Sequence, residues 1–155
     1  MATPATDALD SAGVTYRLVH QHNVTSIEEA AAQSGVDVSD IIKTIVVRRA
    51  DDDFVFVLVP GGRAISWPKL RAVLGVKRLS LPDAATAKDV TGYERGTITP
   101  FGSSQAWPVV ADERIEGREI RLGAGAHDIA VVLSATDAVR ALDASYADVT
   151  DRVPA

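Results

Sequence analysis

The sequence predicts an α+β fold: a single domain, residues 1–155, in which helices flank a mixed β-sheet. Segments with helical capping signals and segments rich in β-branched residues are interleaved irregularly along the chain. Several predicted strands are joined by turns of hairpin length, which gives antiparallel neighbours. The 155 residues, 46% of them hydrophobic and 24% charged, suit one domain with a hydrophobic core. No linker, internal repeat or low-complexity tract divides the sequence.

Five helices are expected from signals at their ends. Pro4 directly after Thr3 marks the start of the first helix. Two overlapping capping boxes at 25–29 precede an alanine-rich second helix, which Gly35 ends. The expected ranges are 3–13, 25–35, 66–75, 83–90 and a last helix from 134 onward.

The expected strands are 16–20, 41–49, 54–60, 107–111, 119–122, 129–133 and a final 147–149. Residues 54–60 are apolar at successive positions, so this strand should be covered on both faces. The polar turn 50–53 joins it to 41–49, and we expect this hairpin in the middle of the sheet. By contrast, 91–102 holds three glycines and a proline without sustained periodicity, which is typical of a loop.

Composition excludes several classes of function. The chain has no cysteine, which rules out disulfides, cysteine-ligated zinc and a thiolate nucleophile. A net charge of -5 argues against a protein that grips long stretches of phosphate backbone. Residues 41–80 nevertheless carry eight basic residues and three acids, a net +5, so the remainder carries -10. This basic segment suits a short anionic ligand such as the end of a nucleic acid, or it forms solvated faces of helices and strands.

The N-terminal residues 1–10 lack a basic segment followed by an apolar core, and the longest apolar runs are too short to span a bilayer. We therefore expect a cytoplasmic protein with no membrane partner.

Lys43 is the most informative single residue. It lies in a run of β-branched and apolar residues, 41–47, where its ammonium group is expected to be partly desolvated and to need a partner or a function. Such a lysine can hold a phosphate or a carbonyl oxygen, or transfer a proton if burial lowers its pKa. The alternative is an outward-facing lysine on an edge strand that discourages aggregation.

Two glycine-rich segments are candidates for ligand contacts. In 92–102, glycine allows backbone groups to approach a ligand and proline stiffens the rest, although most loops of this composition are only turns. The run 123–127 superficially resembles a nucleotide-binding loop, but it lacks the third glycine and a surrounding strand–helix–strand unit. A tight turn between two strands is the better interpretation.

Metal and serine-hydrolase chemistry are not supported. The three histidines are His20, His22 and His127, and no further ligand at a recognisable spacing completes a metal site. No Gly-x-Ser-x-Gly nucleophile motif is present. We expect neither a metal nor a cofactor.

In this order, the motifs resemble the YbaK/ProX family of aminoacyl-tRNA deacylases, which are related to the editing domain inserted in bacterial prolyl-tRNA synthetases. The resemblance runs from about Tyr16 to Val149. It is carried by Lys43 in its apolar strand, the block 91–102, the strand 108–112 and the turn 123–125.

The resemblance implies a partly barrel-like sheet and hydrolysis of the ester that joins a wrongly attached small amino acid (cysteine, alanine or serine) to the 3′ adenosine of tRNA, with tRNA-Pro the expected carrier. It implies that Lys43 is important for activity and that Gly96 to Pro100 line the aminoacyl pocket. The expected substrate-binding residues are His22, Gly92, Tyr93, Gly96, Thr97, Ile98, Thr99, Pro100, Phe101, Gly102, Asp112, Gly123, Ala124 and Gly125. The expected partners are the acceptor end of aminoacyl-tRNA and a synthetase, not DNA.

One departure affects substrate choice. The family often has a longer basic stretch after the 123–125 turn, whereas this chain continues Ala126-His127-Asp128. Two other functions stay open at this point: a non-catalytic module that binds the tRNA end or a synthetase, and a hydrolase or binder of another small acylated molecule.

Overall fold

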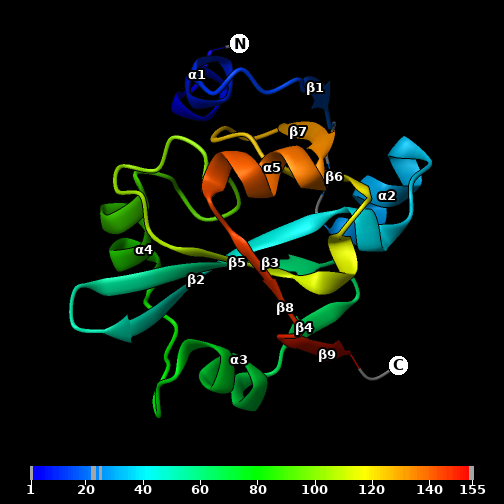
Figure 1. Ribbon diagram of the computed structural model, residues 1–155. Coiled ribbons are helices and arrows are strands. Elements are labelled where there is room, and N and C mark those ends of the chain that lie inside the picture. The colour runs from blue at the N-terminus through cyan, green and yellow to red at the C-terminus, as the bar shows by residue number, and fades with distance from the viewer. Residues whose placement is uncertain (1, 22–23, 25, 154–155) are drawn as a thin grey trace.

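Figure 1 shows the computed structural model, in which residues 2–21, 24 and 26–153 are described. The helices begin and end close to the predicted residues. Thr3, Ser26, Ser66, Asp83 and Ser134 act as N-caps, each accepting a hydrogen bond from a backbone N–H three residues ahead. Their helices are α1 (Pro4–Ser11), α2 (Ile27–Ser34), α3 (Trp67–Leu74), α4 (Ala84–Thr91) and α5 (Ala135–Leu142). No helix in these ranges is long and apolar enough to cross a bilayer.

The strands form three sheets rather than one. Their bounds are β1 (Arg17–His20), β2 (Ile42–Ala50), β3 (Asp53–Pro60), β4 (Arg63–Ile65), β5 (Val109–Asp112), β6 (Glu119–Gly123), β7 (Ile129–Ser134), β8 (Ser145–Ala147) and β9 (Thr150–Arg152). The largest sheet has the order β2-β3-β5-β8, and it is mixed because β2 and β3 are antiparallel while β3, β5 and β8 are parallel. A second sheet has the order β1-β7-β6, and β4 pairs with β9. The α+β class and the mixed pairing are confirmed, and the described strands do not close into a barrel.

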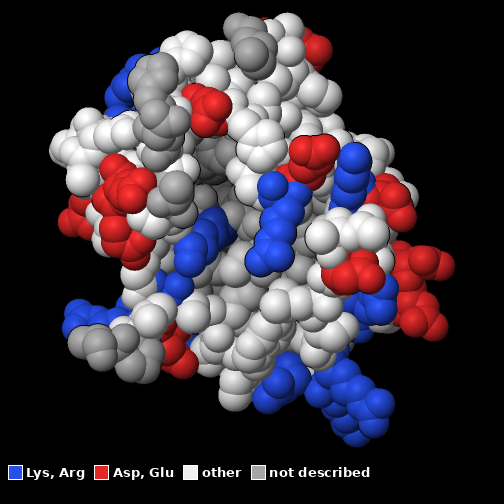
Figure 2. All heavy atoms as spheres, turned by 180° about the vertical axis from the view of Figure 1, so that it is seen from behind, with Lys and Arg blue, Asp and Glu red and all other residues white. Residues whose placement is uncertain are grey.

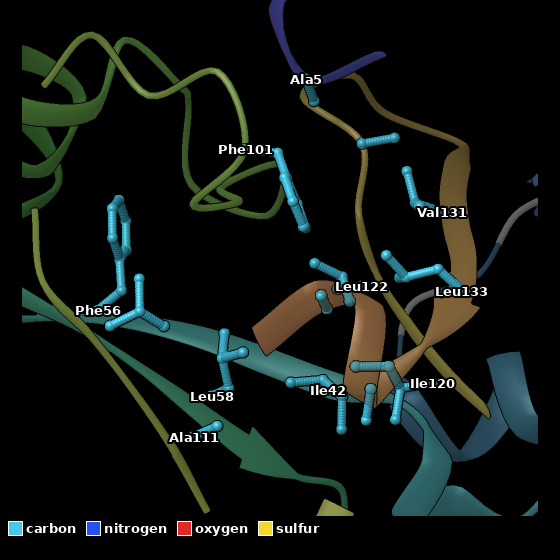
Figure 3. Packing of buried hydrophobic residues seen from close by; sticks show 14 of the residues in the cluster. Ala5, Ile42, Phe56, Leu58, Phe101, Ala111, Ile120, Leu122, Val131 and Leu133 are labelled. Carbon is cyan, nitrogen blue, oxygen red and sulfur yellow. The ribbon is translucent and has the colours of Figure 1, made fainter. Parts of the chain in front are cut away.

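Strand β3 is buried on both faces, as its apolar run predicts. Phe54, Phe56 and Leu58 pack into one core cluster, with β6, β7, α5 and Phe101. The intervening Val55, Val57 and Val59 pack into a second cluster, with Leu70 of α3. In Figure 1, α5 and the three-stranded sheet lie on one side of the four-stranded sheet, and α3 with β4 and β9 lies on the other. Figure 3 shows Phe101 reaching toward the first cluster. The burial of each such side chain is worth about 1.5–3 kcal/mol.

Two predictions about the strands are wrong. The predicted hairpin exists, but only β3 lies inside the sheet, because β2 is at its edge. The final strand, expected at 147–149, is instead two short strands, of which β8 ends at Ala147 and β9 begins at Thr150, and β4 was not predicted. Strands of three residues are too short to show a period in sequence, and β4 and β9 pair only with each other.

Candidate active site beside strand β2

A cavity of about 720 Å³ opens beside the first half of β2. It lies between the start of α2, strand β2, the 92–102 loop and the end of β6. Among the residues that line it are Lys43, Thr44, Arg95, Gly96, Ile98 and Gly123. This volume is within the usual range of about 300–1,000 Å³ for small-molecule sites. Figure 2 shows Lys and Arg side chains around a hollow near the middle of one face.

Lys43 lines this cavity and is exposed. The expectation that its apolar neighbours desolvate the ammonium group is therefore wrong. Ile42 is buried in the core, but β2 is an edge strand, so the neighbours of Lys43 along the chain do not enclose it. The ammonium group is available to a ligand in the cavity as a hydrated point charge.

Two side-chain hydrogen bonds hold the 92–102 loop in place. The Tyr93 hydroxyl is buried and donates a hydrogen bond to the Phe101 carbonyl oxygen at 2.7 Å. The Thr97 hydroxyl donates to the Glu94 carbonyl oxygen, also at 2.7 Å. Burial raises the pKa of Tyr93 to about 12, so its hydroxyl stays protonated and keeps donating at neutral pH. These contacts leave Gly96 and Ile98 facing the cavity on a stiff support.

The 123–125 turn lies directly against this loop. The Gly125 N–H donates to the Thr97 carbonyl oxygen at 3.1 Å. A Cβ atom on Gly123 would lie 2.7 Å from the Ile98 carbonyl oxygen, and one on Gly125 would lie 2.7 Å from the Tyr93 ring. The two glycines are therefore required for this close approach.

The predicted site residues fall into four groups. Lys43, Gly96, Ile98 and Gly123 line the cavity together. Behind its wall lie Tyr93, Thr97, Thr99, Pro100, Phe101 and Ala124, which are buried, and Gly125, which packs on Tyr93. Gly92 and Gly102, both with positive φ, stand at the ends of the loop. Asp112 lies elsewhere, and His22 is outside the described residues.

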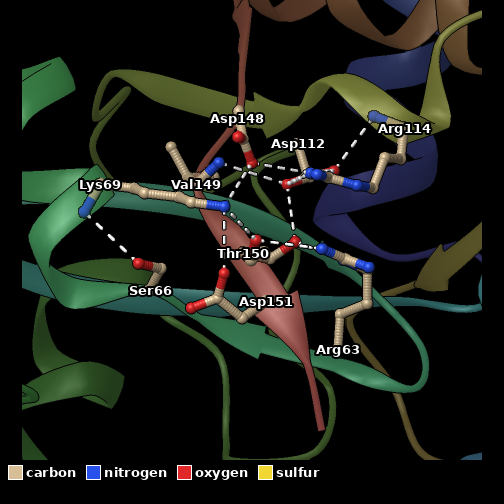
Figure 4. Close-up of polar contacts among 9 residues, drawn as sticks. All are labelled: Arg63, Ser66, Lys69, Asp112, Arg114, Asp148, Val149, Thr150 and Asp151. Atoms are coloured by element: carbon tan, nitrogen blue, oxygen red, sulfur yellow. Dashed lines mark hydrogen bonds and ion pairs between the residues drawn. The ribbon is translucent and has the colours of Figure 1, made fainter.

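Asp112 lies outside the cavity, in a network of polar contacts between β5, β9 and α3 (Figure 4). Its buried carboxylate accepts hydrogen bonds from the Thr150 hydroxyl at 2.8 Å and from the Arg114 guanidinium at 3.1 Å. Arg114 also binds Asp148, as Lys69 of α3 does, and these two partners lower the pKa of Asp148. The network ties β5 to β9 and α3, and Asp112 does not line the cavity.

Seven of the residues that line the cavity were not among the predicted site residues, and two of them, Arg95 and Thr44, offer polar groups of particular interest. Arg95 brings a second cation to its wall, and the Thr44 hydroxyl oxygen is buried there without a hydrogen-bond partner. Arg95 lies inside the glycine-rich block, but nothing in the sequence separates it from a solvated surface arginine. Thr44 follows Lys43 directly and would have been found only by treating both faces of the strand as candidates.

The fold and the cavity define a small α+β domain with a cation-bearing cavity for a small ligand. The family model described as "aminoacyl-tRNA editing domain" matches residues 21–141, and the chain belongs to that family. The proline–tRNA ligase of Thermosipho melanesiensis is 35% identical over 99 residues, which are 64% of this chain and 17% of the ligase. That of Thermosipho africanus is 33% identical over 107 residues, 69% of this chain and 19% of the ligase. The chain thus matches less than a fifth of the length of these relatives.

Two solved structures share the fold. One is the crystal structure of a hypothetical protein, with a TM-score of 0.88 and 26% identity, covering 96% of this chain and all of the other. The other is described as a proposed trans-editing enzyme for prolyl-tRNA synthetase, with a TM-score of 0.88 and 21% identity, covering 97% of this chain and 99% of the other. The resemblance inferred from the sequence motifs is confirmed at the level of the family.

Proposed function

We propose that this domain hydrolyses the ester of mischarged tRNA, acting on small amino acids such as cysteine, alanine or serine. One observation carries the proposal: Lys43 shares its cavity with Gly96 and Ile98 of the loop that the family resemblance assigns to the aminoacyl group. Membership in the editing family and the likeness to a proposed trans-editing enzyme support it. The site would act where translation takes place, in the cytoplasm.

Hydrolysis of this ester needs only a few contributions from the protein. An aminoacyl ester is already activated, so the site has to position it, neutralise charge near the terminal adenosine and admit a water or a substrate hydroxyl as the nucleophile. Lys43 anchors the adenosine or the ester end, and backbone groups of Gly96 to Pro100 hold the amino acid. The rigid contacts of Tyr93 and Thr97 keep that segment in place between turnovers.

Selection among amino acids would depend on the size of the pocket. A hydrophobic pocket separates two substrates that differ by one methylene by only about 1–3 kcal/mol. The matched ligases act with proline and its tRNA, so tRNA-Pro is the proposed carrier and a prolyl-tRNA synthetase the proposed partner. With a net charge of -5, we expect contact mainly with the acceptor end.

The direct test is incubation of the purified protein with tRNA-Pro carrying alanine, cysteine, serine or proline, followed by measurement of the surviving ester. Loss of one mischarged species with sparing of prolyl-tRNA is the expected result. Binding of the tRNA without loss of any ester would favour a non-catalytic module with the same fold. Absence of both would favour a different acylated substrate and contradict the proposal.

A further inference from the structure

The edge of β2 stays open between two bridges. Ile41 is bridged to Arg121 at one end, and Arg48 exchanges backbone hydrogen bonds with Ser80 at the other, at 2.8 and 3.1 Å. Backbone groups alternate in direction along a strand, so those of Thr44 and Val46 face the same open side as those of Arg48. This stretch of strand therefore presents polar backbone groups to whatever lies beside it.

A second hollow, of about 560 Å³, continues from the candidate active site along this edge. The two hollows share four lining residues, Thr44, Ile45, Arg95 and Ile98, so they are connected. The far wall of the second is mostly apolar and includes Leu81, whose exposed fraction of 58% is the largest among the exposed large hydrophobic residues of the described chain. An exposed leucine beside an open strand edge offers an apolar contact surface to a planar ring of a ligand.

A third hollow, of about 570 Å³, lies at the other end of the same strand. It is lined by five basic residues, Arg48, Arg49, Arg71, Lys77 and Arg78, and one acid, Asp51. Arg49 is held by Asp53. Within the described chain, the side chains of Arg71, Lys77 and Arg78 make no hydrogen bond or ion pair, so their charges are not used to hold the fold.

Another arginine-rich surface of the protein differs in this respect. Arg63, Arg114 and Arg118 line a hollow on that surface. Each is bonded within the protein, to Thr150, Asp112 and Asp40 respectively. Those arginines stabilise the structure, whereas Arg71, Lys77 and Arg78 of the third hollow have no partner in the part of the protein that the structure describes and can bind an anionic ligand.

Two buried polar atoms on β2 also lack partners. Thr44 lines both of the first two hollows, and the Arg48 guanidinium, whose Nε has no hydrogen-bond partner among the described residues, packs over the Phe54 ring at 5.6 Å. A buried polar group without a partner costs about 1–3 kcal/mol. The Thr44 hydroxyl would gain a partner from a polar ligand in these two hollows.

We propose that the open edge of β2 from Lys43 to Val46, with the two connected hollows beside it and the basic third hollow beyond the Arg48–Ser80 bridge, is a binding track for the single-stranded 3′ end of tRNA. The first hollow takes the aminoacyl ester, the apolar second contacts the bases, and the basic third binds phosphates further from the 3′ end. The six residues from Lys43 to Arg48 span about 17 Å, a length that a few nucleotides can follow. The track rests on the proposed function for the identity of the nucleic acid, and its binding can be measured without hydrolysis.

The test measures binding of an uncharged RNA hairpin that carries the acceptor stem and its single-stranded 3′ end, by fluorescence anisotropy. In the groove variant Arg71→Gln/Lys77→Gln/Arg78→Gln, we expect Kd to rise at least tenfold. The matched control Arg17→Gln/Arg140→Gln/Arg152→Gln removes the same charge from residues that line none of the three hollows, and should change Kd less than about threefold. Loss of three phosphate contacts should also reduce the slope of log Kd against log salt by about two.

The track would be overturned by equal weakening of binding in the groove and control variants, or by equal binding of the wild type to a hairpin that lacks the single-stranded end. Absence of any RNA binding by the wild type would overturn it as well. Deacylation is measured separately, where the groove variant should raise KM more than it lowers kcat. If the wild type hydrolyses no ester while the groove variant still loses RNA affinity, the proposed function fails and the track stands.

Discussion

At the scale of the residue, Tyr93 holds the candidate site together through one buried hydrogen bond. Its pKa is raised from 10.0 to about 12, so the folded state keeps the phenol proton more tightly than the unfolded chain does. The stabilisation is complete below about pH 10 and is lost as the pH rises toward 12. We expect the free energy of unfolding, measured in urea, to fall across this window.

In Tyr93→Phe this fall should be smaller, and stability at pH 7 should be lower by about 1–3 kcal/mol because the Phe101 carbonyl loses its donor. Tyr16 and Tyr146 also have raised pKa values, so the free energy of unfolding of Tyr93→Phe should still fall somewhat at high pH because of these two residues. A fall of unchanged size in Tyr93→Phe would contradict the role given to Tyr93.

Gly102 and Gly75 allow a comparison at nearly equal backbone angles, with φ of 70° and 67°. Alanine at either position costs about 1–2 kcal/mol for the left-handed conformation. At Gly75 nothing lies within 4 Å of the added Cβ, whereas at Gly102 the Cβ would lie 2.3 Å from the Pro4 carbonyl oxygen. Thermal unfolding should therefore show a clearly larger loss for Gly102→Ala than for Gly75→Ala, and equal losses would contradict the contact between the loop and α1.

At the scale of the element, Asp112 connects β5 to β9 and, through Arg114 and Asp148, to α3. Asp112→Ala leaves the buried Thr150 hydroxyl and the Val149 N–H without their acceptor and should cost about 1–3 kcal/mol of stability for each donor. Asp151→Ala removes an exposed carboxylate of the same network and should cost far less. Deacylation per folded molecule should be unchanged in both, and a selective loss of activity in Asp112→Ala would instead assign that residue to substrate binding.

The helices could be predicted because their signals are local. Each N-cap hydrogen bond joins residues three apart, and the glycines that end α2 and α3 adopt positive φ within the same turn. The burial of β3 could be predicted for the same reason, since its apolar run reports directly that both faces are covered. The order of the sheet could not, because the position of β2 at an edge depends on partners far away in the chain.

The candidate site, too, could be predicted only in part. Lys43 and the segment from Gly96 to Pro100 were predicted to act together, and Lys43 lines one cavity with Gly96 and Ile98 of that segment. The exposure of Lys43 was missed because a strand's neighbours in sequence do not show which of its edges is open. Arg95 and Thr44 were missed because their importance comes only from the surfaces that meet around them.

At the scale of the whole molecule, a net charge of -5 coexists with three cations in the hollow at the end of β2, Arg71, Lys77 and Arg78, which are unpaired within the described ranges of the chain. Acidic surroundings limit contact with the body of a tRNA, so only a few phosphates near the 3′ end should be neutralised. Each contact with a single strand contributes about 0.7 to the slope of log affinity against log salt. We expect a slope magnitude of about 2 to 3 for wild-type binding, and a much steeper one would contradict a contact limited to the acceptor end.

The account depends most on Lys43. Deacylation of mischarged tRNA-Pro should be measured for Lys43→Ala beside Arg140→Ala, which removes the same charge from a side chain of α5 that is 73% exposed. Lys43 is exposed, so the variant should fold like the wild type, and we expect its kcat/KM to fall about a hundredfold or more while Arg140→Ala stays near the wild-type value. Hydrolysis by Lys43→Ala at the wild-type rate would contradict the central claim that this ammonium group positions the ester.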